Sequence, residues 1–136
     1  MKKLLPTAIL LSCIILFACK AQQKKSSYLE ITFGSGGGFT GKYIEYTLNP
    51  DGKLIKNIFD NKPSLLKQLD KKQCQALFEK AASLKLESIE LNVPANMNKY
   101  IIVKTAAGAH KINWGGSKSP SDDVLKFYDE LMLLVK

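Results

Sequence analysis

Two short segments in the first half of the chain alternate apolar and polar residues, and a strong turn signal follows the second. In residues 28–33 and again in residues 43–48, every second side chain is apolar. Such alternation is typical of strands with one buried face. The Asn-Pro-Asp-Gly sequence at positions 49–52 predicts a turn, because proline restricts φ and glycine accepts a left-handed conformation. Residues 53–59 should return as a third strand, so the three strands predict an antiparallel meander. The face expected to be buried in the first strand carries Leu29, Ile31 and Phe33.

Two later segments have the periodicity of helices with one apolar face. The first begins at Asp70, with Gln73 completing a capping box, and should end near Lys85. The second has Ser119 as its predicted N-cap and Pro120 at its first helical position. The expected apolar stripes are Cys74, Leu77, Phe78, Ala81 and Leu84 in the first helix, and Val124, Phe127, Tyr128, Leu131, Leu134 and Val135 in the second.

A second hairpin is expected between the helices. Residues 92–98 form a predicted loop around Pro94, and residues 100–105 and 109–114 are predicted strands that turn at Gly108. The chain is therefore expected to form a two-layer α+β domain with about five mostly antiparallel strands and both helices on one sheet face. We expect this single domain to span residues 28–136.

The first 18 residues differ in character from the rest of the chain. Two lysines precede an apolar stretch at residues 4–18. At about 15 residues this stretch is too short to cross ~30 Å of hydrocarbon, so it is typical of a secretory signal peptide. Residues 19–27 follow as a predicted flexible tether, because residues 20–27 have no apolar periodicity.

The end of the apolar stretch, Leu16-Phe17-Ala18-Cys19, resembles the lipobox of bacterial lipoproteins. The resemblance implies that the Cys19 thiol carries fatty acyl chains such as palmitate and that the leader is cut just before Cys19. Two or three acyl chains hold a protein at a membrane essentially permanently. Phe17 is a less typical occupant of the motif. An ordinary signal peptidase cut after Ala21 is the alternative, and it would release a soluble product.

The mature part resembles small uncharacterised lipoproteins of the Bacteroidetes. The resemblance rests on the lipobox, lysine-only basic residues, a Gly-Gly-Gly-Phe-Thr-Gly segment at positions 36–41 and an Asp-Gly turn at positions 51–52. It brings no known activity. Lys20, rather than aspartate, follows the cysteine and resembles the pattern of outer-membrane lipoproteins. We therefore expect a lipid-anchored envelope protein in the outer membrane, facing the periplasm or the cell surface.

The net charge of +8 suggests nucleic-acid binding until the charges are located along the chain. Five of the 20 lysines precede Tyr28, and 15 lysines then face 12 acidic residues, which is a net of +3. The chain has no arginine, the side chain that contacts guanine through two hydrogen bonds. We therefore expect no nucleic-acid partner. The lysines of the tether fit beside anionic lipid headgroups, or they are simply solvated.

The glycine-rich segment at residues 34–42 comes close to two phosphate-binding motifs. Tyr43, however, stands where such a loop needs serine or threonine, and a predicted strand follows where a helix is required. We therefore expect a hairpin loop and no nucleotide. Within it, Gly37, Gly38 and Phe39 are candidates for ligand or partner binding. The alternative is that the Phe39 side chain folds back onto the sheet.

Trp114, His110 and Cys74 are three further functional candidates. Trp114 offers an aromatic platform beside two glycines, or else fills the core. His110 is the only histidine, which excludes a multi-histidine metal site within one chain, and it shares a strand face with apolar residues. Cys74 lies on an apolar helix stripe, where a thiol is usually inert packing. We expect no metal and no cofactor, and we favour a non-enzymatic protein while leaving an enzymatic role open.

The sequence leaves three functional hypotheses. The first is a non-enzymatic domain that contacts another envelope component, such as an envelope protein. The second is a small-ligand module for a sugar or peptide, built on the glycine-rich loop and Trp114. The third is a hydrolase centred on His110, although the chain has no nucleophile-elbow motif.

Overall fold

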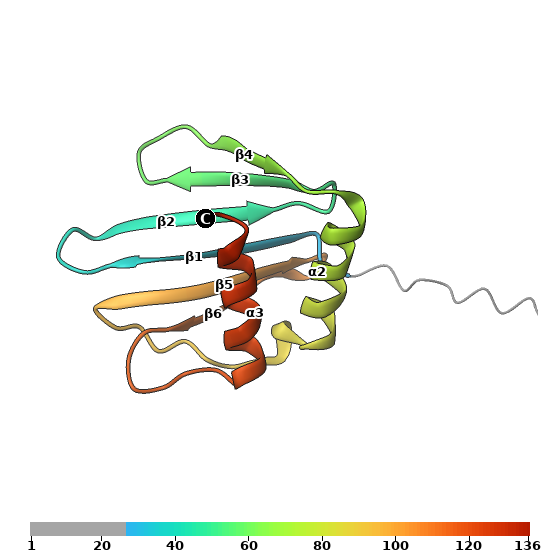
Figure 1. The fold of residues 1–136 in the computed structure, drawn as a ribbon. Helices are drawn as coiled ribbons and strands as arrows, with labels where there is room; N and C mark the ends of the chain where they lie inside the picture. The colour runs from blue at the N-terminus through green and yellow to red at the C-terminus, as the bar shows by residue number, and fades with distance from the viewer. Residues whose placement is uncertain (1–26) are drawn as a thin grey trace, which may run out of the picture.

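One antiparallel sheet and two α-helices build residues 27–136, the part of the chain that this computed structural model describes (Figure 1). The six strands lie in the order β4-β3-β2-β1-β5-β6. The fold is α+β, as predicted. The strands are β1 (Glu30–Gly37), β2 (Lys42–Leu48), β3 (Lys53–Ile58), β4 (Ser64–Gln68), β5 (Met97–Thr105) and β6 (Gly108–Trp114). The helices are α2 (Lys71–Ser83) and α3 (Asp122–Leu133), with a short 3₁₀ helix, η2 (Leu86–Ser88), between α2 and β5.

The predicted meander and second hairpin are both confirmed. In the meander, β1 pairs with β2 and β2 with β3, and in the hairpin β5 pairs with β6. The central strand is β1, in which Phe33 lies opposite Tyr46 on one side and Ile101 on the other. This strand continues through Gly37, four residues beyond the predicted end. Most of the glycine-rich segment is therefore sheet, and only residues 38–41 form the turn.

The sheet has six strands where about five were expected, because β4 was missed. All five residues of β4 are exposed, so they have no alternation of buried and exposed side chains. The strand forms because its backbone pairs with β3. The start of β5 was also missed, since Met97 was assigned to the loop at residues 92–98 and instead pairs with Gly37.

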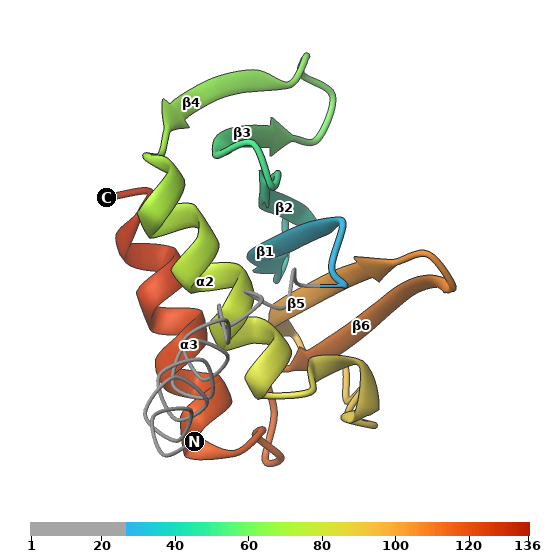
Figure 2. The ribbon, with the colours of Figure 1, turned by 90° about the vertical axis from the view of Figure 1, so that its right-hand side faces the viewer.

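Both helices cover the same face of the sheet (Figure 2). Their predicted stripes pack against the apolar core, in which Leu84 and Val135 are partly buried and the other stripe residues are buried. The Asp70 cap is confirmed, because its carboxylate accepts a hydrogen bond from the Gln73 amide at 2.9 Å. The N-cap of α3 is Ser121 rather than Ser119, and Pro120 precedes the helix. The largest fully buried side chains include Phe33, Phe127, Ile31, Leu48, Leu54, Leu86, Ile101, Ile112 and Leu131.

The first strand departs from its predicted pattern at one end. Leu29, expected in the core, is 53% exposed, whereas Tyr28, expected on the polar face, is buried. Both residues precede β1, so the alternation of the strand does not extend to them. The Tyr28 hydroxyl donates a hydrogen bond to Glu87 of η2, which places this side chain under the 3₁₀ helix.

Candidate functional site

One end of the sheet projects beyond both helices and carries most of the exposed large apolar side chains. The β1–β2 turn, the β3–β4 turn and the start of β5 meet there, at the end remote from α2 (Figure 1). Ten large apolar side chains are exposed within residues 27–136, and six of them belong to this end. We call this end, formed by residues 37–44, 58–63 and 96–99, the free end of the sheet. Its six exposed large apolar side chains are Phe39, Tyr43, Ile44, Ile58, Phe59 and Met97.

Strand pairing brings these residues together from distant parts of the sequence. Ile44 of β2 lies opposite Ile58 of β3, and Met97 of β5 lies opposite Gly37 of β1. The four strands are consecutive in the sheet. Since neighbouring strands are ~4.8 Å apart, the free end is about 15 Å wide.

Phe39 stands at the tip of the β1–β2 hairpin and is 107% exposed. Gly38 and Gly41, at opposite ends of the turn, have φ angles of 70° and 61°. These are left-handed conformations that suit glycine. The Gly38 amide donates a hydrogen bond to the Asn96 carbonyl at 2.5 Å, which fastens the turn to the segment before β5. The alternative that Phe39 folds back onto the sheet is therefore wrong.

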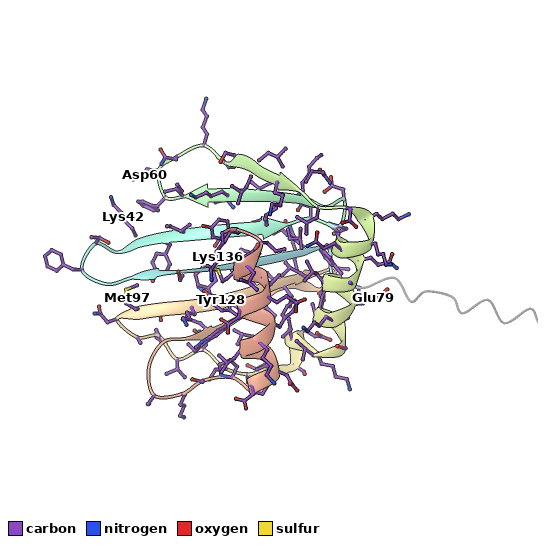
Figure 3. All side chains as sticks on the ribbon, in the orientation of Figure 1. Lys42, Asp60, Glu79, Met97, Tyr128 and Lys136 are labelled. Atoms are coloured by element: carbon purple, nitrogen blue, oxygen red, sulfur yellow. The ribbon has the colours of Figure 1, made fainter. Side chains whose placement is uncertain are left out.

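The free end is positively charged as well as apolar. Its segments, residues 37–44, 58–63 and 96–99, carry Lys42, Lys62 and Lys99 against Asp60, a net of +2 from three lysines and one carboxylate. Figure 3 shows Lys42, Asp60 and Met97 at this end and Glu79 of α2 at the opposite end of the molecule. The Lys99 ammonium lies 5.8 Å from the centre of the Tyr128 ring, and Lys42 and Lys62 are exposed.

The glycines of β1 allow two tyrosines to lie flat across that strand. A Cβ on Gly34 would come within 2.9 Å of the Tyr100 hydroxyl, and a Cβ on Gly36 within 2.7 Å of the Tyr43 ring. Tyr100 donates a hydrogen bond to Glu45 at 3.0 Å, and the Lys111 ammonium lies 4.4 Å from the centre of its ring. Burial, followed by the neighbouring Glu45, raises the pKa of Tyr100.

This arrangement explains the glycine-rich segment without a phosphate ligand. A phosphate-binding loop follows a strand and opens a helix, whose amide groups face the anion. Residues 36–42 instead end one antiparallel strand, turn and start the next. The glycines are used for close approach of tyrosine side chains and for the tight turn.

Of the predicted binding residues, Gly37, Gly38 and Phe39 belong to the free end or its turn, and Trp114 does not. Trp114 is 4% exposed and its ring packs edge-on against Tyr128 of α3, with ring centres 5.2 Å apart. It fills the core rather than presenting a platform. Cys19 and residues 20–26 of the tether lie outside the described residues, so lipid attachment stays a prediction.

The remaining candidates, His110 and Cys74, both have hydrogen-bond partners within the fold. The His110 Nε2 atom lies 2.8 Å from the Ile89 carbonyl, which satisfies the half-buried ring. The buried Cys74 thiol donates to the Asn49 carbonyl at 3.4 Å, and desolvation raises the pKa of this thiol. In the part of the chain that the structure describes, no group of three His, Cys, Asp or Glu side chains is arranged to hold a metal ion.

Comparison with known proteins does not assign a function to the free end. No protein-family model and no curated protein matches the chain. None of the helices in residues 27–136 is long and apolar enough to span a bilayer. The free end must therefore be interpreted from its own chemistry.

The sequence places Phe39 near the tip of a turn, as observed, but it does not single out most of the other exposed apolar residues at this end. Phe59 was placed in the third strand, yet an Asp-Asn-Lys-Pro sequence follows it directly at positions 60–63. An aromatic residue beside such turn residues is a signal for an exposed loop tip, as at Phe39. Met97 had no comparable signal, because its exposure depends on which strand lies beside it.

Proposed function

We propose that this protein is a lipid-anchored lipoprotein of the cell envelope whose domain contacts another envelope component through the free end of the sheet, without catalysis. One observation carries the proposal. Six of the ten exposed large apolar side chains are gathered at one end of the sheet. Exposed apolar residues are normally scattered over a protein surface, so their concentration in two turns and in the adjoining strand ends, on both faces of the sheet, supports an interaction surface at this end.

The direction of the chain supports this use of the free end. The described chain enters β1 at the end of the sheet beside α2, and β1 leads from there to the free end (Figure 1). Eight residues of strand extend over about 27 Å. A tether that ends at residue 27 therefore joins the domain far from its apolar turns, which leaves them accessible.

The composition of the free end also fits contact rather than chemistry. Phe39 and Phe59 are large apolar side chains at the tips of two turns, at 107% and 71% exposure. Aromatic side chains provide a large contact area and dominate the energetics of many interfaces. The segments of the free end contain no histidine or cysteine that would act as a base or nucleophile.

The small-ligand alternative receives less support. Its aromatic platform, Trp114, is buried under α3. Its glycines are Gly37 and Gly38. A Cβ on Gly37 would meet the Asn96 carbonyl oxygen at 2.4 Å, and one on Gly38 would meet the Met97 sulfur at 3.0 Å, so neighbouring atoms already lie against this backbone.

Two experiments test the proposal, one for the lipid anchor at Cys19 and one for the contact at the free end. Cys19→Ser should move the protein from the membrane fraction to the soluble fraction, or leave an uncleaved leader that intact mass spectrometry detects. A photo-reactive residue at position 39 should cross-link to envelope material in intact cells, and the same residue at position 79, at the opposite end of the domain, should not. Unchanged fractionation of Cys19→Ser together with a cleaved leader contradicts the lipid anchor, and equal cross-linking at both positions contradicts the contact at the free end.

A further inference from the structure

We infer that the free end rests in the headgroup region of an anionic bilayer, the same bilayer that holds the acyl chains of Cys19. This inference deepens the proposed function and depends on it, because it identifies the contacted envelope component as a lipid surface. The domain would then be attached at two points: by lipid at its tether and by side chains at its free end.

The side chains exposed at the free end are of a kind that enters lipid headgroups. Phe39 and Phe59 project from two neighbouring turns, and Met97 is 56% exposed beside them. Apolar side chains at the edge of a domain enter the boundary between headgroups and acyl chains, and binding strength increases with the apolar area they bury. Turns present such side chains to a flat surface without opening the sheet.

The free end also carries positive charge. Its three segments contain Lys42, Lys62 and Lys99 and one carboxylate, Asp60. Lys42 and Lys62 lie in or next to the two turns, whereas Lys99 extends toward the Tyr128 ring of α3. Lysine ammonium groups are attracted to the negative surface of a bilayer that contains anionic lipids. Apolar turn tips with lysines beside them are therefore complementary to an anionic lipid surface and poorly matched to a neutral one.

The length of the tether limits how the domain can lie on the bilayer. The predicted tether, residues 19–27, has nine residues and spans at most about 30 Å when extended. The strand that separates its attachment point from the free end is about 27 Å long. Residue 27 lies three residues before β1 and Phe39 two residues after it, so a free end that touches the membrane requires an almost fully extended tether to a lipid on Cys19. A much shorter tether would hold the free end away from that bilayer.

The experiment uses the full processed protein reconstituted into vesicles. Phe39→Trp places a fluorescent reporter at the tip, and Glu79→Trp places one at the opposite end (Figure 3). Trp114 is buried and is present in every variant, so the parent protein supplies the background. The vesicles contain brominated phosphatidylcholine, which quenches tryptophan on contact, with or without phosphatidylglycerol.

The inference predicts a specific pattern of quenching. In vesicles with phosphatidylglycerol, the emission of residue 39 should be shifted to the blue and quenched severalfold more than that of residue 79. In phosphatidylcholine alone the difference should shrink. Replacing Lys42 and Lys62 together with glutamine should lower the equilibrium constant for contact between the free end and the bilayer roughly 25-fold. Each lysine near an anionic surface contributes a factor of about five to that constant.

Two results separate failure of this inference from failure of the proposed function. If the protein does not float with the vesicles at all, the lipid anchor is absent and the proposed function fails with it. If the protein floats but residue 39 is quenched no more than residue 79, the anchor stands and the bilayer contact is overturned. Cross-linking of residue 39 to an envelope protein in cells, without quenching by lipid, overturns the bilayer contact in favour of a protein partner.

Discussion

Tyr100 donates a hydrogen bond to Glu45 across the central strand, at 3.0 Å, and lies over Gly34 as it does so. In the register of the sheet, Gly34 is the residue between the two, paired with Glu45 on one side and Tyr100 on the other. On the opposite face, the Tyr128 hydroxyl of α3 donates to the Gly34 carbonyl at 3.0 Å. The central strand is thus held between tyrosines from both faces at a position where a side chain has no space.

Gly34→Ala should therefore destabilise the protein. The added Cβ would lie 2.4 Å from the Ile44 carbonyl oxygen and 2.9 Å from the Tyr100 hydroxyl. Overpacking of this kind typically lowers the free energy of unfolding by about 1–3 kcal/mol. Gly116→Ala is the matched control, because its Cβ would meet only Ala95 at 3.7 Å. Urea unfolding measures both variants, and equal midpoints would show that Tyr100 moves aside at little cost.

The Tyr28–Glu87 hydrogen bond should make stability depend on pH in the acid range. The bond from Tyr28 is the largest influence on Glu87 and lowers the pKa of its carboxyl group. A carboxylate with a lowered folded-state pKa stabilises the protein above its unfolded pKa, and that contribution is lost as the pH falls. Tyr28→Phe should lower the free energy of unfolding by about 1 kcal/mol at neutral pH. The difference from the parent should fade below roughly pH 4, under the ordinary glutamate pKa. A difference that stays constant down to pH 3 would refute this origin.

The two helices have N-caps of different strength. Asp70 accepts a hydrogen bond from the Gln73 amide, whereas Ser121 makes no side-chain cap bond. Asp70→Ala should therefore lower the free energy of unfolding by about 1 kcal/mol. Ser121→Ala should change it by less than about 0.5 kcal/mol. Thermal unfolding by circular dichroism distinguishes these outcomes, and equal shifts would contradict the assignment.

Apolar contacts, rather than the ion pair between the helices, should hold α3 in place. Lys80 of α2 pairs with Glu130 of α3, but both side chains are more than 40% exposed. An exposed pair of this kind contributes at most about 1 kcal/mol. Phe127 is fully buried, and Phe127→Ala should lower the free energy of unfolding by about 3–5 kcal/mol. In denaturant titrations, Lys80→Gln should lower the free energy of unfolding less than Phe127→Ala does. A larger loss for Lys80→Gln would show that the ion pair contributes more than the apolar contacts.

Local patterns in the sequence predicted the elements that depend on near neighbours. The capped helix at Asp70, the hairpin turning at Gly108 and the turn at residues 49–52 all appear where they were expected. Their determinants lie within about one helical turn or one hairpin loop of each other. The failures are positions whose state depends on a remote partner. Tyr28 is buried against Glu87, which is 59 residues away, and β4 forms against β3 although its own residues show no periodicity.

By itself, the sequence determined an α+β domain, the course of its meander and helices, and an aromatic residue in a glycine-rich turn. Only the tertiary structure decided that Phe39, Phe59 and Met97 lie at one end of one sheet, and that Trp114 and Tyr28 are buried. The physical reason is that strand order and helix position are set by the burial of the whole apolar surface in one core. Which apolar side chains stay exposed depends on how the whole chain packs that core, so the local sequence does not specify their exposure.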